Sequence, residues 1–250
     1  LYGDLDVSVI DELPPGRKPI HTIHRRENHR DKLFAFIHEQ LQLGRQAYVV
    51  YPLIQESEKL DFKNLEDGYA QIEDFFKPQG FQISMVHGKM KPADKEAAMQ
   101  AFVQGQTHIM VATTVIEVGV NVPNASVMVI ESAERFGLSQ LHQLRGRVGR
   151  GAEKSFCILM TGDGISKEAQ KRMDTMVGSN DGFVLAEVDL QLRGPGDLMG
   201  TQQSGVLALK IADLAKDGQL VQLAREKARE ILDTDPQLID PNHALLNQAL

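Results

Sequence analysis

The sequence lacks several features that would place it among secreted or membrane proteins. It contains no run of 18 apolar residues, so no segment is expected to cross a membrane as a helix. Its one cysteine, Cys157, excludes an internal disulfide and fits a reducing cytoplasm. The chain also starts at Leu1 with neither a signal peptide nor an initiator methionine, and we therefore expect a fragment of a longer cytoplasmic protein.

An excess of positive charge is lacking as well. The chain has 27 Lys and Arg against 34 Asp and Glu, a net charge of −7 at pH 7. This balance argues against a basic coat for nucleic acid spread over the whole surface. Residues 140–150 (QLHQLRGRVGR) nevertheless contain three arginines and no acid. The basic charge is therefore focused in one segment, and it has to be interpreted locally.

Prolines near the start indicate a linker. Residues 11–19 (DELPPGRKP) contain three prolines and a glycine, which cannot continue a helix or a central strand. We assign residues 1–27 to the end of a preceding lobe and this linker. Residues 28–160 are assigned to one α/β domain, and residues 161–250 to a mainly helical extension.

Helical and strand patterns alternate in the α/β domain. One helical face is formed by Leu33, Phe34, Ile37 and Leu41. Strand-like runs occur at residues 47–51, 81–86, 108–112, 126–130 and 155–160. This order predicts βαβ units and a parallel sheet with helices on both faces. Ligands are expected beyond the carboxyl ends of such strands, in loops 52–57, 87–91, 113–121 and 131–138.

The extension reads as helices joined by one glycine-rich loop. Ser166 is a candidate N-cap for a first helix, and the turn at residues 179–182 predicts a second helix packed against it as a hairpin. Residues 193–205 (RGPGDLMGTQQSG) contain four glycines and a proline, and we expect a loop there. A further amphipathic helix is predicted to end near residues 233–236.

The strongest chemical signal is the pattern Q-x-x-G-R-x-G-R, which runs from Gln143 to Arg150. Three arginines without a local acid repel one another unless an anion compensates them. The guanidinium fork suits phosphate oxygens. A solvated basic helix face is the alternative, but it does not require the two glycines that let a backbone approach a ligand.

These residues resemble the sixth motif of superfamily 2 helicases. Residues 111–125 (VATTVIEVGVNVPNA) resemble the fifth motif, and VHGKM at residues 86–90 matches the segment before it. The string ERFGLSQLHQLRGRVGRG at residues 134–151 is similar to RecG helicases and to transcription-repair coupling translocases. The resemblance extends over essentially the whole chain, and the linker and loop favour RecG. It implies a second RecA-like motor lobe.

The resemblance implies that Arg147 and Arg150 face the phosphates of ATP across a cleft, while Gln143 orients that region. The other matched nucleotide positions are Gly119, Asn121 and Gly146. Most members of the superfamily have an aspartate at the position of Asn121. The asparagine can still form hydrogen bonds there, but it cannot take the role of a carboxylate. ATP and Mg²⁺ are the implied cofactors, held mainly by a first lobe. No metal site is expected in this chain.

Three residues match positions that approach the DNA backbone: Thr113, His87 and Gly88. Thr113 and His87 have structural alternatives, because Thr113 can serve as a turn hydroxyl and a lone histidine is more often structural. A backbone N–H at Gly88 can approach a phosphate closely. The extension resembles the translocation motif of RecG, which implies coupling roles for Arg172, Arg193 and Gln203. The loop can also be a plain connector.

A phosphate-binding loop is absent. No G-x-x-x-x-G-K-[ST] occurs, and no acidic metal-binding box follows a strand. We therefore expect this chain not to hydrolyse ATP alone. The implied partners are branched double-stranded DNA, together with the N-terminal motor lobe and wedge domain of the same protein in a bacterial cytoplasm. Three alternatives stay open: a transcription-repair translocase, a non-catalytic nucleic-acid adaptor, and a nucleotide-binding regulator.

Overall fold

The computed structural model describes residues 19–53, 58–113, 122–151, 154–197, 218–236 and 240–243. The chain divides into two compact units, Asp6–Leu192 and a second formed mainly by Arg193–Leu250. Each unit is considered separately below. No helix in the described ranges combines the length and the apolar character that crossing a bilayer requires.

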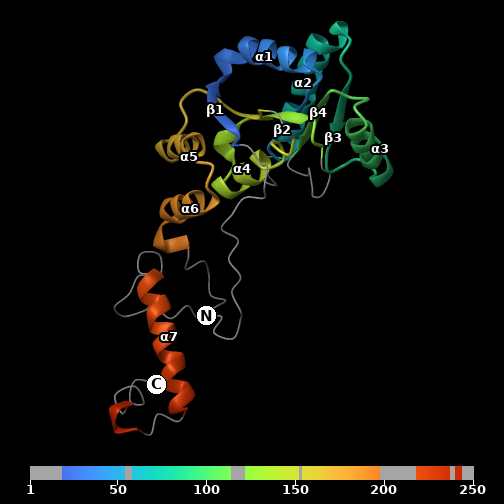
Figure 1. The fold of residues 1–250 in the computed structure, drawn as a ribbon. Helices are drawn as coiled ribbons and strands as arrows, with labels where there is room; N and C mark the ends of the chain where they lie inside the picture. Colours follow the sequence, from blue (N-terminus) through green and yellow to red (C-terminus); the bar gives the residue numbers. More distant parts are fainter. Residues whose placement is uncertain are drawn as a thin grey trace. The chain divides into compact units, whose positions relative to one another are not determined.

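The first unit is built on a six-stranded, fully parallel sheet with the order β1-β6-β5-β2-β4-β3 (Figure 1). Its strands are β1 His21–Arg26, β2 Gln46–Tyr51, β3 Ile83–Val86, β4 Ile109–Thr113, β5 Ala125–Ile130 and β6 Phe156–Thr161. Every residue of β2, β4 and β5 is buried. The short apolar runs therefore form central strands covered on both faces, as the sequence predicts.

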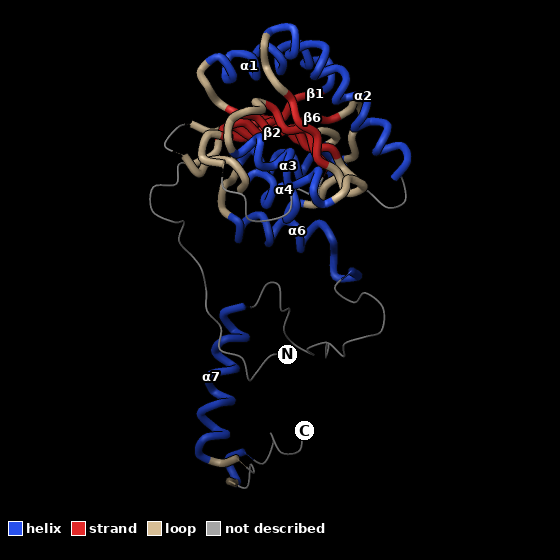
Figure 2. Tube along the Cα trace, turned by 90° about the vertical axis from the view of Figure 1, so that its right-hand side faces the viewer, coloured by secondary structure: helices blue, strands red, loops and turns tan. Residues whose placement is uncertain are grey.

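Helices cover the two faces of the sheet (Figure 2). One face carries α1 Arg30–Gln42 and α2 Glu58–Phe76, whose apolar residues share a core with Val49, Val111 and Val129. The opposite face packs against α3 Pro92–Val103, α4 Leu138–Arg145, α5 Lys167–Gly178 and α6 Gly182–Asp197. Alternate residues of β2, β4, β5 and β6 contribute to the two cores, which confirms the predicted RecA-like architecture.

Local signals in the sequence specify several helix ends. The buried face of α1 consists of the four predicted residues, Leu33, Phe34, Ile37 and Leu41. Gly44 and Gly105 follow α1 and α3 with φ angles of +75° and +72°, a conformation that glycine adopts without strain. The Ser166 hydroxyl accepts a hydrogen bond from the backbone N–H of Ala169 at 3.1 Å and caps α5.

Three boundaries differ from the predictions. Residues 21–26, assigned to the preceding lobe and linker, form edge strand β1 beside β6. The α5–α6 hairpin, assigned to the extension, shares a core with the sheet through Met173, Met176 and Leu185, so the compact unit ends at Leu192 and not near residue 160. Helix α6 also continues through Arg193 to Asp197, where a loop was expected.

In the second unit, the described residues form α7 Gly218–Thr234 and a short 3-10 turn, Pro241–His243. Helix α7 ends where the sequence predicts. The Thr234 hydroxyl donates to the Glu230 carbonyl at 3.0 Å, and Asp235 contacts the His243 ring at 2.9 Å. The second contact holds the 3-10 turn beside the end of the helix.

Candidate functional site

The segment with the three arginines begins on α4 and continues into the turn after it. Leu138, Leu141 and Leu144 of α4 are buried at helical spacing in the core below the sheet. Gln143 lies on the exposed side of the same helix. Gly146 follows as the C-cap, where its N–H donates to the His142 carbonyl at 3.0 Å. The packing of the leucines thus fixes the direction in which the polar side chains project.

Arg145 differs from its two neighbours because it is 2% exposed. Its guanidinium donates to the carbonyls of Met176 at 2.9 Å and Ser179 at 2.7 Å, at the end of α5. It also bonds the Thr22 hydroxyl and the His142 ring. Burial lowers the pKa of Arg145 from its usual value. The interpretation of three arginines sharing one anion is therefore wrong for this residue, since carbonyls at a helix C-terminus compensate its charge.

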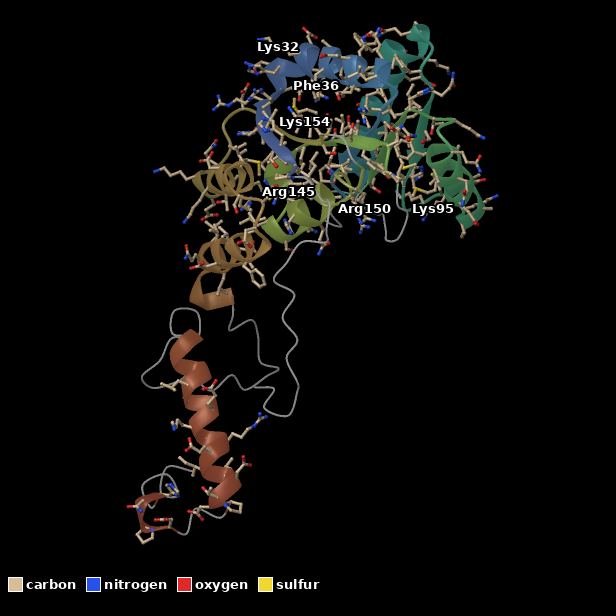
Figure 3. The ribbon with its side chains drawn as sticks, viewed as in Figure 1. Lys32, Phe36, Lys95, Arg145, Arg150 and Lys154 are labelled. Atoms are coloured by element: carbon tan, nitrogen blue, oxygen red, sulfur yellow. The ribbon has the colours of Figure 1, made fainter. Side chains whose placement is uncertain are left out.

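Arg147 and Arg150 remain available to a ligand. Arg147 is half-buried and Arg150 is exposed, and neither has a carboxylate partner among the described residues. Burial raises the pKa of Tyr48 in β2 to about 12, and both guanidiniums act in the opposite direction. Figure 3 shows Arg145 and Arg150 on the side of the sheet opposite α1.

The turn that carries these two arginines is rigidly seated. Val148 lies between them and is fully buried, which anchors the backbone from below. Gly149 has a φ of +79°, a conformation that a side chain would strain. At Gly151, an added Cβ would lie 2.4 Å from the Pro123 carbonyl oxygen, so only glycine fits against this backbone. The turn therefore packs against the end of the segment that resembles the fifth motif.

The predicted DNA-contacting residues lie side by side at one edge of the sheet. Val86 of β3 is in register with Ala112 of β4, so His87 and Thr113 follow neighbouring strand ends. Burial, with a contribution from Lys95, lowers the pKa of His87. The Gly88 carbonyl accepts a hydrogen bond from Lys95 Nζ at 3.0 Å, which orders this turn.

Thr113 itself is fully buried. Its hydroxyl has no hydrogen-bond partner in the part of the chain that the structure describes. The side chain is thus withdrawn from the surface at which a DNA contact was expected. The predicted nucleotide positions Gly119 and Asn121 lie outside the described residues.

Of the three predicted coupling residues, Arg172 is the one whose contacts are described. Its Nη2 donates to the Glu134 carbonyl at 2.7 Å, in the 3-10 turn Ala133–Arg135 that follows β5. Its Nε is buried and has no hydrogen-bond partner among the described residues. Arg172 therefore ties α5 to the end of β5, and its buried Nε is left without a partner among the described residues. The side chain of Arg193 and all of Gln203 lie outside the described residues.

The sequence did not reveal an acidic cleft at the carboxyl ends of β2, β5 and β6. Arg30 donates to Glu131 at 2.6 and 2.9 Å and to Glu27 at 2.6 Å, while Arg135 pairs with Asp61. The cleft has a volume of about 380 Å³, and its walls include Tyr51, Asp61, Asp67, Glu131, Glu134 and Thr161. Its acids would repel a phosphate. The loops at the strand ends were predicted as ligand sites. The sequence did not predict that Arg30 and Glu131, which are 101 residues apart, form a pair.

Comparisons with known proteins agree with the fold described above. Residues 29–152 match the family described as Helicase conserved C-terminal domain, and residues 179–250 match ATP-dependent DNA helicase RecG, domain 3, C-terminal. The ATP-dependent DNA helicase RecG of Synechocystis sp. is 52% identical over 95% of this chain and 28% of its own length. The Bacillus subtilis helicase of the same name is 47% identical over 100% of this chain and 36% of its own length.

A solved structure is also similar. In the structure of RecG bound to a three-way DNA junction, the matching chain is 42% identical with a TM-score of 0.68, over 88% of this chain and 28% of that one. The chain thus spans about a third of the length of the relatives it matches.

Proposed function

Since the chain belongs to the RecG family of ATP-dependent DNA helicases, we propose that it is the second motor lobe, with its extension, of an enzyme that remodels branched DNA. Stalled replication forks and recombination junctions in the bacterial cytoplasm are the proposed substrates. The similarity to RecG bound to a three-way junction supports this substrate class. The relatives named above favour this function over a transcription-repair translocase.

The observation that carries the proposal is the state of Arg147 and Arg150. Both lie on a turn anchored by Val148, and neither has a carboxylate partner among the described residues. A guanidinium held in place without a countercharge suits the phosphates of ATP bound by another lobe. That first lobe would supply the phosphate-binding loop and most of the Mg²⁺ site, which this sequence lacks.

In the proposed mechanism, closure of the two lobes brings Arg147 and Arg150 to the γ-phosphate. The charge that develops on its oxygens during transfer is stabilised by the two guanidiniums. Gln143, on the exposed side of α4, orients the region around the γ-phosphate. Gly146, together with Gly119 and Asn121, provides close backbone approach to the nucleotide.

DNA is proposed to run past the adjacent ends of β3 and β4. Gly88 is exposed there and His87 is half-buried, whereas Thr113 would have to act after a local rearrangement, because its hydroxyl is buried. Arg172, Arg193 and Gln203 are proposed to convert lobe movement into displacement of DNA. The contact of Arg172 with the Glu134 carbonyl supports a link between α5 and the end of β5.

The test is ATP turnover by a protein that joins this chain to its first motor lobe. Arg150→Ala should lower kcat on the order of 10³-fold, while DNA affinity changes little. Lys154→Ala, which removes an exposed cation four residues away, is the matched control and should leave kcat within about twofold. Normal turnover with lost DNA binding would assign Arg150 to the nucleic acid.

A further inference from the structure

The contacts of Arg145 join the α5–α6 hairpin to the turn that carries Arg147 and Arg150, called the arginine turn below. Its guanidinium reaches the Met176 and Ser179 carbonyls at the point where the chain leaves α5. No carboxylate balances this charge among the described residues. The partial negative charge of the last carbonyls of α5 does so instead. A buried cation thus fixes the end of one helix of the hairpin to α4.

A second contact reinforces this link from the other helix of the hairpin. A guanidinium has no acceptor, so the His142 ring must accept the Arg145 hydrogen bond at Nδ1, which leaves its proton on Nε2. That Nε2 lies 3.1 Å from the position of a Cβ on Gly182, the first residue of α6. Any larger residue at the start of α6 would push on the ring. Both helices of the hairpin therefore touch the same corner of α4.

The main chain of Arg145 also supports the arginine turn. The backbone N–H of Val148 donates to the Arg145 carbonyl at 3.3 Å, and the N–H of Arg147 donates to the Leu144 carbonyl at 3.0 Å. A shift of Arg145 with the hairpin would therefore be passed to Val148, the residue that follows Arg147 in the turn. The path runs from the two hairpin carbonyls through the buried Arg145 side chain to the backbone hydrogen bond of Val148.

We propose that Arg145 is the positioning residue that sets Arg147 for catalysis and makes its position depend on the α5–α6 hairpin. The inference rests on the proposed function, because Arg147 acts only if it meets a nucleotide. Carbonyl partners suit such a role. A guanidinium can exchange one carbonyl for another without leaving an opposite buried charge behind, as it would with a carboxylate.

The test is a double-mutant cycle on kcat in the two-lobe protein with DNA present. Arg145→Gln alone should lower kcat by about ten- to hundredfold with little change in KM, as expected when a reacting group is misplaced by about 1 Å. In an Arg147→Ala background, the same change should lower kcat by less than about threefold. A full multiplicative loss in that background would overturn the inference and leave the proposed function standing. Normal turnover by Arg147→Ala alone would overturn both.

Gly182→Ala keeps the test open if Arg145→Gln fails to fold. It retains Arg145 and crowds His142 from the hairpin side, so kcat should fall less steeply, and again only when Arg147 is present. An equal loss in both backgrounds would contradict the inference. The control is Ile37→Val, which loosens α1 on the opposite face of the sheet. Its effect on kcat should be the same in both backgrounds, because a purely structural change has no path through Arg147.

Discussion

The arginine turn after α4 and the acidic cleft at the ends of β2, β5 and β6 hold their arginines in opposite ways. In the cleft, Arg30 is bonded to Glu131, whose side chain is 4% exposed, and Arg135 is paired with Asp61. In the turn, Arg147 and Arg150 have no carboxylate partner among the described residues. The first arrangement braces the fold, and the second holds positive charge ready for an anion from outside.

Arg145 shows that position in the sequence does not decide between these uses. It lies two residues from Arg147, yet it is buried and bonded to main-chain carbonyls. The lobe therefore uses its arginines in three ways. Arg30 and Arg135 are paired with carboxylates, and Arg145 is bonded to main-chain carbonyls. Arg147 and Arg150 have no carboxylate partner among the described residues. The substitutions below separate these three uses.

Loss of Arg172 is expected to affect unwinding far more than ATP turnover. Its bond to the Glu134 carbonyl supports the proposal that it couples lobe movement to DNA and takes no direct part in catalysis. Arg172→Ala should leave most DNA-stimulated ATP turnover intact while fork unwinding falls roughly tenfold or more. Both rates are measured on the same preparation. Equal losses of turnover and unwinding would show that Arg172 builds the motor.

A loss of stability is expected from the cleft. Arg30→Ala leaves Glu131 buried without its partner, which costs about 3–5 kcal/mol of unfolding free energy. Thermal unfolding of the two-lobe protein should show a lowered first transition, with kcat unchanged at temperatures well below it. Glu27→Ala removes the exposed partner of Arg30 and should cost less than about 1 kcal/mol. A fall in kcat for Arg30→Ala at low temperature would show that the cleft also acts in catalysis, which would contradict the distinction between the two regions.

The smallest effect concerns the DNA affinity of this 250-residue chain alone. The acidic cleft opposes DNA, and the proposed contacts from Gly88, His87 and Thr113 neutralise few phosphates. A plot of log affinity against log salt should therefore have a slope no steeper than about −3. Fluorescence anisotropy with a labelled three-way junction at several salt concentrations provides the measurement. Tight binding with a steeper slope would reveal a basic surface beyond these contacts.

Much of the fold was predictable because its signals are local. The helical face of α1, the glycines after α1 and α3 and the Ser166 cap all depend on residues within a few positions of one another. Strand β1 was missed because an edge strand buries little. Its sequence HTIHRR places one residue fully inside and has no apolar run. The extent of α6 was underestimated because glycine and proline at its end favour a loop.

The candidate site was predictable in its motif and not in its partners. The arginine pattern predicts a turn that faces a phosphate, but three neighbouring arginines look alike in a sequence. The acceptors of Arg145 lie 31 and 34 residues away and are main-chain atoms, so no pattern of side chains in the sequence predicts them. The same holds for Arg30 and Glu131, which are 101 residues apart. Contacts of this kind become visible only when the chain is folded.

The central claim, that Arg147 and Arg150 act on the nucleotide, is tested most directly with a transition-state analogue. ADP with aluminium fluoride should bind the Arg150→Ala two-lobe protein more weakly by about the same factor as kcat/KM falls, on the order of 10³. Affinity for unreacted ATP should change far less. Equal weakening of analogue and ATP, or unchanged affinity for both with a loss of DNA binding, would contradict the account.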